Sequence, residues 1–250
     1  MSSGASSEKK DVARNVPDPD PGKGDAYIWR CICVASRLRV ANHLSKTREI
    51  QDAKAFLTRV RSQIASGQLL VTSDKLRAYP QALLDVFGDP EPEPEKLLGR
   101  PRVHRRKVFP PGFLYGQIDK ERVHGHLVAV ERRALVGTMD QISFVLDRDN
   151  LCKVINTSFV ERDNLSVRQH NGRLVRKTLS YSKNWQMHQY AIDFEDAVHN
   201  FVRPHFSLRM PLREQYGPCL WQPQTPAMAA GITDHVWSMR ELVTYRPPPR

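Results

Sequence analysis

The chain has 250 residues, which suffices for one substantial domain with tails or for two small domains. Its net charge of +11 favours a polyanionic partner, nucleic acid before a membrane, although a basic protein that only needs solubility would carry the same charge. No stretch approaches the roughly 18 apolar residues of a membrane span, which excludes a chain that crosses a membrane through such a helix.

The first part of the chain predicts alternating strands and helices after a polar start. Residues 1–24 contain Asp-Pro repeats that are typical of a disordered lead-in. The predicted elements, taken from alternating or helically spaced apolar residues, are a strand over 26–34, its hairpin partner over 38–44, a helix over 49–64, a strand over 69–72 and a helix from about Lys75 to Phe87. This order indicates a mixed α/β sheet.

The second part of the chain is less regular. Proline and glutamate alternate from Pro90 and a basic run ends at Lys107, so residues 89–125 predict a mobile insertion. The further predicted elements are short strands over 127–130 and 134–136, a short helix over 139–146, a helix over 159–177 capped by Thr157 or Ser158, and a helix over 184–201. Residues 211–250 are punctuated by proline and predict a loosely packed tail.

The four cysteines are Cys31, Cys33, Cys152 and Cys219, and they contain no Cys-x-x-Cys pair. Their spacing therefore gives no support to a zinc ribbon or finger. Because no secretory signal precedes them, reduced thiols are predicted in place of disulfides.

Asp74 is the first candidate for chemistry, because it directly follows an apolar strand. Open α/β sheets place catalytic and ligand-binding groups at the carboxyl ends of their strands. An aspartate before Lys75-Leu76-Arg77 is equally a good helix N-cap. Position alone leaves both interpretations open.

Glu161 is the second candidate and lies in the first turns of a predicted helix. It shares one side of that helix with Asn164, Leu165 and Arg168, and the apolar residues there suggest that this side borders the core. Glu161 is either a solvated edge residue or a site residue.

The five cations of the same segment suit a DNA backbone and equally a solvated face; they are Arg162, Arg168, Arg173, Arg176 and Lys177.

Several segments together resemble, in the expected order, a bacterial insertion-sequence transposase family of the DDE superfamily. Residues 71–79 (VTSDKLRAY) resemble its middle-Asp segment, and residues 156–178 (NTSFVERDNLSVRQHNGRLVRKT) resemble its terminal-Glu segment. Residues 200–209 (NFVRPHFSLR) and 225–235 (TPAMAAGITDH) are similar to its usual continuation. The similarity spans roughly residues 24–246.

The resemblance implies an RNase H-like domain over residues 25–210 that cleaves and joins DNA at the ends of the element. Three carboxylates would hold two Mg²⁺ or Mn²⁺ ions, which clamp the attacking and leaving oxygens. Asp74 and Glu161 match the second and third carboxylates and would be catalytic metal ligands.

The implied partners are double-stranded DNA, as element ends and as target, and further copies of the chain in an oligomer on DNA. The implied place is the bacterial cytoplasm, at the nucleoid. The implied DNA contacts are Arg105, Arg106, Arg162, Asn164, Arg168, Arg173, Arg176 and Lys177.

The first carboxylate is where this chain departs from the family. The family's first strand ends in an Asp-Ala-Asp-Thr-like turn, and aligning residues 36–38 with the end of that turn puts Cys33 at the first Asp and Ala35 at the second. Asp25 lies eight residues upstream, about 26 Å along a strand, and cannot substitute. A thiol is a poor ligand for a hard ion. We therefore expect either a transposase with impaired strand transfer or a catalytically silent relative that still binds DNA. Compared with the family, we also expect the chain to be truncated at its amino end.

Overall fold

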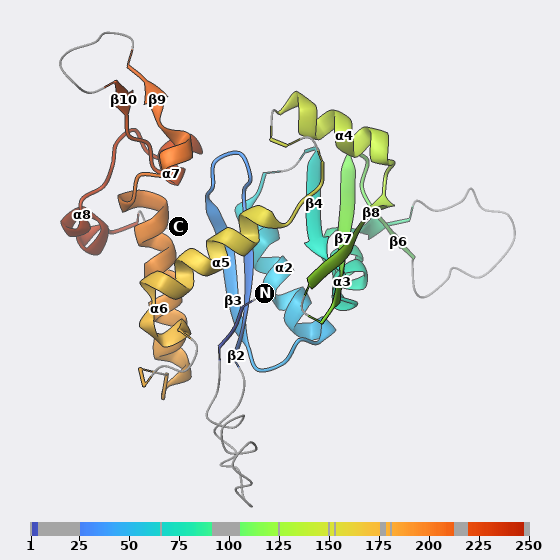
Figure 1. Cartoon of the computed structure of the whole chain (residues 1–250), viewed down its shortest axis with the longest axis horizontal. Helices are drawn as coiled ribbons and strands as arrows, with labels where there is room; N and C mark the ends of the chain where they lie inside the picture. Colours follow the sequence, from blue (N-terminus) through green and yellow to red (C-terminus); the bar gives the residue numbers. More distant parts are fainter. Residues whose placement is uncertain are drawn as a thin grey trace, which may run out of the picture. The chain divides into compact units, whose positions relative to one another are not determined.

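The computed structural model describes residues 2–4, 26–65, 67–91, 106–124, 126–149, 151–152, 154–175, 179–180, 182–212 and 220–247, without the side chains of residues 2–4 and 122 (Figure 1). Apart from residues 2–4, the predicted lead-in lies outside the described residues. So do Asp25, Arg105, Arg176, Lys177 and Cys219. The chain divides into two compact units, one formed by residues 1–46 with 159–250 and the other by residues 47–158. The predicted mixed α/β class is confirmed.

The first unit is built on an antiparallel sheet with the order β1-β2-β3. Its strands are β1 (Ser2–Gly4), β2 (Ala26–Ile32) and β3 (Arg39–Ser45). The β2–β3 pairing runs from Tyr27 opposite Ser45 to Ile32 opposite Arg39, which confirms the predicted hairpin.

Helices lie beside this hairpin in the same unit (Figure 1). They are α5 (Ser158–His170), the 3₁₀ turn η1 (Gly172–Leu174), α6 (Trp185–Ala197) and the π-helical turn η2 (Val198–Val202). Ile28, Leu44 and Ile192 are among the buried side chains that join hairpin and helices. Helix α5 ends before residue 177, because the Asn171 side chain accepts a hydrogen bond from the Arg173 amide and Gly172 lowers helix propensity.

The carboxyl-terminal segment contains short elements only, as an irregular tail should. These are η3 (Phe206–Leu208), β9 (Met210–Pro211), β10 (Trp221–Gln222), α7 (Pro226–Ala229) and α8 (Met239–Thr244). Part of the segment is nevertheless packed. Thr225 and Pro226 are fully buried, and the Trp237 ring lies 4.7 Å from that of Phe201 and 5.1 Å from that of Tyr245. Contacts between aromatic rings therefore anchor a segment whose prolines prevent long helices.

The second unit is a mixed three-stranded sheet covered by helices. Its elements are α2 (Ile50–Gln63), β4 (Leu69–Asp74), α3 (Ala78–Phe87), β5 (Asp89–Pro90), β6 (Lys107–Val108), β7 (Phe113–Val123), β8 (His126–Val136) and α4 (Met139–Arg148). The order is β4-β7-β8, with β4 parallel to β7 and β7 antiparallel to β8. Ile142 and Val145 of α4 pack on Leu114 and Ile118 of β7.

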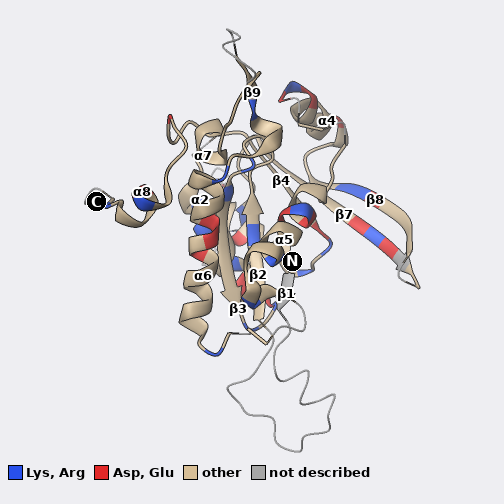
Figure 2. Ribbon diagram, turned by 60° about the vertical axis from the view of Figure 1, so that its left-hand side comes forward, with Lys and Arg blue, Asp and Glu red and all other residues tan. Residues whose placement is uncertain are grey.

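The prediction of an insertion through residue 125 is wrong for residues 113–123, which form a central strand. Two short strands were predicted over 127–136, where β8 is continuous. The reason is that only the first half of β7 is buried, up to Ile118. Beyond it β7 carries alternating charges (Figure 2), and the charged residues 131–133 interrupt the apolar residues of β8, so apolar alternation does not mark two continuous strands. In the described part of the chain, no helix has the length and apolarity needed to cross a membrane.

Gly116 of β7 offers a test of this packing. We expect Gly116→Ala to lower the free energy of unfolding by about 1–3 kcal/mol, because the added Cβ would lie 2.6 Å from Ile155 Cδ1. Ile155→Val removes that methyl group, so the double variant should lose less stability in urea than the two single variants together. Additive losses would contradict the proposed contact.

Candidate active site

Asp74 is the exposed last residue of β4 and lies in register with Ile118 of β7. Helix α3 begins only at Ala78, with Arg77 as its N-cap residue, so the interpretation of Asp74 as a helix N-cap is wrong. Pro80 explains the late start, since proline is tolerated in the first turn of a helix and not in its interior. Asp74 thus occupies the strand-end position that suits chemistry.

The backbone around Asp74 is fixed while its carboxylate faces solvent. The Gln117 Nε2 group donates to the Asp74 carbonyl oxygen at 3.2 Å, and the Ser73 hydroxyl lies 2.7 Å from the Tyr115 hydroxyl. Burial raises the pKa of Tyr115, and the negative charge of Asp74 adds a smaller contribution. Tyr115 therefore stays protonated and anchors the strand end through its hydroxyl.

The turn between β2 and β3 carries Cys33, which directly follows β2. The Cys33 amide donates to the Leu38 carbonyl at 2.8 Å and closes the turn. Arg37 has a φ of 59°, an uncommon left-handed conformation for a residue with a side chain, and its guanidinium carbon lies 3.9 Å from the Phe159 ring centroid. Phe159 belongs to the first turn of α5, two residues before Glu161. Cys33 and Glu161, the predicted positions of the first and third catalytic acids, therefore lie on neighbouring elements of one unit.

Cys31 differs from Cys33 in its surroundings. Burial raises the pKa of the Cys31 thiol to about 12, with a smaller contribution from Cys33. A thiol that stays protonated is neither a nucleophile nor a metal ligand. The Cys31 thiol is therefore excluded as a nucleophile or metal ligand.

Helix α5 presents Glu161 to solvent on the side that was expected to border the core. Leu165 on that side is 58% exposed, whereas Asp163, Asn164 and Val167 are buried. The expectation that this side borders the core is therefore confirmed at Asn164 and wrong at Leu165. The helix is rotated because its buried side carries an ion pair.

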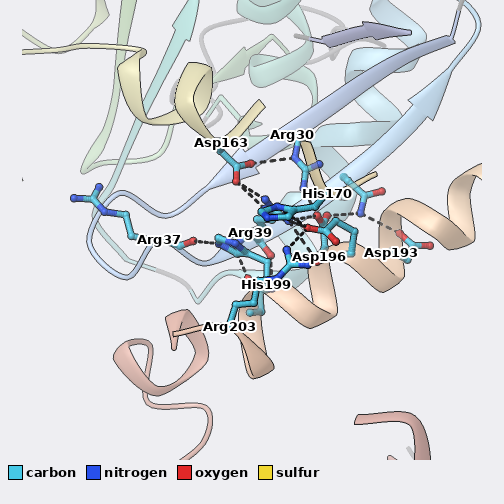
Figure 3. A network of polar contacts seen from close by, with 12 residues as sticks. Arg30, Arg37, Arg39, Asp163, His170, Asp193, Asp196, His199 and Arg203 are labelled. Carbon is cyan, nitrogen blue, oxygen red and sulfur yellow. Dashed lines mark hydrogen bonds and ion pairs between the residues drawn. The ribbon is translucent and has the colours of Figure 1, made fainter. Parts of the chain in front are cut away.

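Asp163 is the α5 residue of that ion pair (Figure 3). Its Oδ1 atom accepts from Arg39 Nε at 2.8 Å and lies 2.7 Å from Arg39 Nη2, and its Oδ2 atom lies 3.3 Å from Arg30 Nε. The Arg39 amide and carbonyl both bond to the Asn200 side chain at 3.0 Å. Strand β3 is thus bound to both α5 and η2.

The other end of the network lies on α6. Arg30 and Arg39 both pair with Asp196, and Asn42 Nδ2 donates to Asp196 Oδ2 at 2.8 Å. Glu195 pairs with Arg203 at 2.7 Å. Burial raises the pKa of Asp196, and the charges of the two arginines oppose that shift. This network was not predicted; its trace in the sequence is one arginine in each strand of the hairpin, Arg30 and Arg39.

Two histidines border the Cys33 turn. His199 Nε2 lies 3.2 Å from the Arg37 carbonyl oxygen, to which it can only donate, and its ring centroid is 6.4 Å from that of His205. Burial and the charge of Arg39 lower the pKa of His199 to about 4, and burial with the charge of Arg37 lowers the pKa of His205. Both rings are neutral at pH 7.

The predicted DNA contacts are distributed unevenly. Arg162 and Arg106 are exposed, and Arg168 and Arg173 are half-buried. Asn164 is buried, and its Oδ1 atom has no hydrogen-bond partner within the described part of the chain. Arg162 is therefore the cation of α5 that is best placed to meet a phosphate.

A family model described as IS1 transposase matches residues 141–201, which run from within α4 into η2 and include all of α5. No curated protein and no solved structure matches the chain. The matched segment supports an insertion-sequence transposase, and Glu161 lies within it.

The two acids of α5 should differ sharply in their effect on stability. We expect Asp163→Ala to lower the free energy of unfolding by about 3–5 kcal/mol, because it leaves Arg39 buried without this carboxylate. Exposed Glu161 provides the matched control, and Glu161→Ala should cost less than about 1 kcal/mol. Urea denaturation measures both, and equal losses would contradict the assigned rotation of α5.

His199 should make stability depend on pH. Its pKa is about 4 in the folded chain against an ordinary value of 6.5, so its contribution is full above pH 6.5 and is lost as the pH falls towards 4. His199→Gln should flatten the fall of the urea midpoint over this range. His235→Gln, which removes a histidine whose pKa is raised by Asp234 and Glu241, should not flatten it. An unchanged slope in His199→Gln would contradict the buried neutral imidazole.

Proposed function

We propose that this chain is a DDE-type transposase of an insertion sequence that binds DNA ends and in which DNA cleavage and strand transfer are impaired. The observation that carries the proposal is the Cys33 turn packed against the first turn of α5, through Arg37 and Phe159. That turn is where the family resemblance places the first catalytic acid, next to the helix of the third. The family match over α5 supports the assignment.

The surroundings of Asp74 and Glu161 support their roles as the other two acids of the proposal. Asp74 ends a strand whose neighbour β7 is buried, and Glu161 lies exposed in the first turn of a helix held by buried ion pairs. Asp74 and Glu161 are both exposed, and polar contacts of neighbouring residues hold the strand end and the helix on which they lie. The order β2, β3, α2, β4, α3 supports the mixed α/β class, and the family resemblance adds an RNase H-like fold to the proposal.

The donor set does not fit two Mg²⁺ ions. At the first position the chain offers the Cys33 sulfur atom, and two residues later the Ala35 methyl group, where oxygen ligands are required. Thiolates prefer softer ions, so a carboxylate-bridged pair of hard ions has no bridging ligand here. For this reason we assign no catalytic step that passes through the metal ions.

DNA binding does not depend on the missing acid. The net charge of +11 and the exposed guanidinium of Arg162 remain available to phosphates. A chain that binds DNA ends without cutting them is the second candidate function, and these charges favour it.

Restoring the acid tests the proposal directly. We expect Cys33→Asp to gain Mg²⁺-dependent cleavage and joining of DNA that carries the terminal sequences flanking the gene, with the natural chain giving little or none. Cys33→Asn is the control, because it has nearly the same shape without the charge and should stay inactive. Glu161→Gln in the Cys33→Asp background should abolish the gain.

Other outcomes of that assay are equally informative. Robust cleavage by the natural chain would show that another acid completes the site. No cleavage by any variant, with DNA binding intact, would favour the second candidate function.

Salt dependence tests DNA binding by itself. We expect the affinity for duplex DNA to fall steeply with salt concentration, and Arg162→Gln to reduce the slope of log K against log salt by about 1. Arg148→Gln is the control, because its guanidinium already pairs with Asp149 at 2.8 Å. A salt-independent affinity, or equal effects of both variants, would contradict the proposed phosphate contact.

A further inference from the structure

An exposed stack of two aromatic rings and one guanidinium lies in the carboxyl-terminal part of the first unit. The Arg209 guanidinium carbon is 3.9 Å from the Phe206 ring centroid and 4.3 Å from that of Trp221. Phe206 is 75% exposed and Trp221 is 44% exposed, whereas Arg209 is half-buried. One face of each ring is covered by the guanidinium, so the exposed surface includes the opposite faces.

The stack is assembled by local hydrogen bonds. Phe206 starts the 3₁₀ turn η3, in which the Ser207 amide donates to His205 Nδ1 and the Leu208 amide to the His205 carbonyl. Trp221 starts β10 and lies opposite Pro211 of β9, and the Leu212 amide bonds to the Leu220 carbonyl at 3.1 Å. Arg209 directly precedes β9. The three groups are therefore held in place before any ligand arrives.

We propose that this Phe206–Arg209–Trp221 stack binds unpaired bases of DNA by stacking them on the two ring faces. The proposal rests on the proposed function and extends it to a particular form of DNA. Every base has a π-face, so a pre-formed aromatic platform binds single strands with little sequence preference. Bases inside a duplex have both faces occupied by their neighbours and cannot use it.

Charge favours a nucleic acid over an apolar protein partner on this surface. Burial of Arg209 in an apolar interface would remove water from a charged group whose neighbours in the stack are uncharged rings. A DNA strand brings phosphates that interact favourably with that charge, and the whole chain carries +11. The guanidinium also adds cation–π attraction to each ring.

The stack adjoins the Cys33 turn through consecutive contacts within the unit. His205 precedes Phe206 directly, its ring lies 6.4 Å from that of His199, and His199 bonds to the Arg37 carbonyl. A strand whose bases stack on Phe206 would therefore pass close to the turn that the family resemblance assigns to strand cleavage. The stack would hold bases next to the DNA end where the strands are separated.

The test compares binding of two labelled probes by the full chain, a short oligo(dT) strand and a blunt duplex of mixed sequence. We expect Trp221→Ala and Phe206→Ala each to weaken binding of oligo(dT) by roughly 5- to 150-fold and to leave duplex binding nearly unchanged. Trp221→Phe should keep most of the affinity for oligo(dT) and lose the part of the tryptophan fluorescence that oligo(dT) quenches. Phe144→Ala, at a 66% exposed ring of α4, is the control and should change neither affinity.

The proposal that the stack binds unpaired bases is overturned if the alanine variants bind oligo(dT) as the natural chain does. It is also overturned if they weaken binding of strand and duplex equally, because the effect is then one of folding or of overall charge. Either result, with duplex binding by the natural chain intact, leaves the proposed function standing. If the natural chain binds neither probe, both proposals fail.

Discussion

The buried pairing of Asp163 with Arg39 is the interaction on which the first unit depends. Each partner would be strongly destabilising if left alone in the interior, so β3 and α5 are stable only together. Arg30 and Asp196 extend the pairing to β2 and α6, and the three arginines and three acids of the network balance in charge. Through this pairing, contacts made inside the unit decide which side of α5 faces solvent.

The functional consequence is that Glu161 is oriented indirectly. Exposed side chains on a helix are aimed by the rotation of that helix, and the rotation of α5 is set two residues later, at Asp163. Arg37 fixes the adjacent turn by stacking on Phe159, with its backbone in a left-handed conformation. The turn that carries Cys33 and the helix that carries Glu161 are thus held in place by groups other than these two residues.

Sequence patterns predicted what depends on local apolar spacing. Helix α2 and the β2–β3 hairpin lie within a few residues of their predicted bounds, because their apolar periodicity and bounding turns are clear. The outer half of β7 was not predictable in this way, because residues 119–122 are all charged and no apolar alternation marks them. The rotation of α5 was out of reach because Arg39 and Asp163 are 124 residues apart. The late start of α3 after Asp74, by contrast, was predictable, because Pro80 is tolerated only in the first turn of a helix.

The hydrogen bonding of the Cys33 turn bears on which substitutions the fold tolerates at this position. The turn is closed by main-chain hydrogen bonding between Cys33 and Leu38, so its shape does not require an acid at the first position. Active-site carboxylates repel each other and generally cost stability, which means that losing one leaves the fold intact or firmer. Under the proposed function, selection for a folded, DNA-binding product would not detect the loss of the first acid. The chemistry of a mobile element can therefore disappear at this residue long before its architecture does.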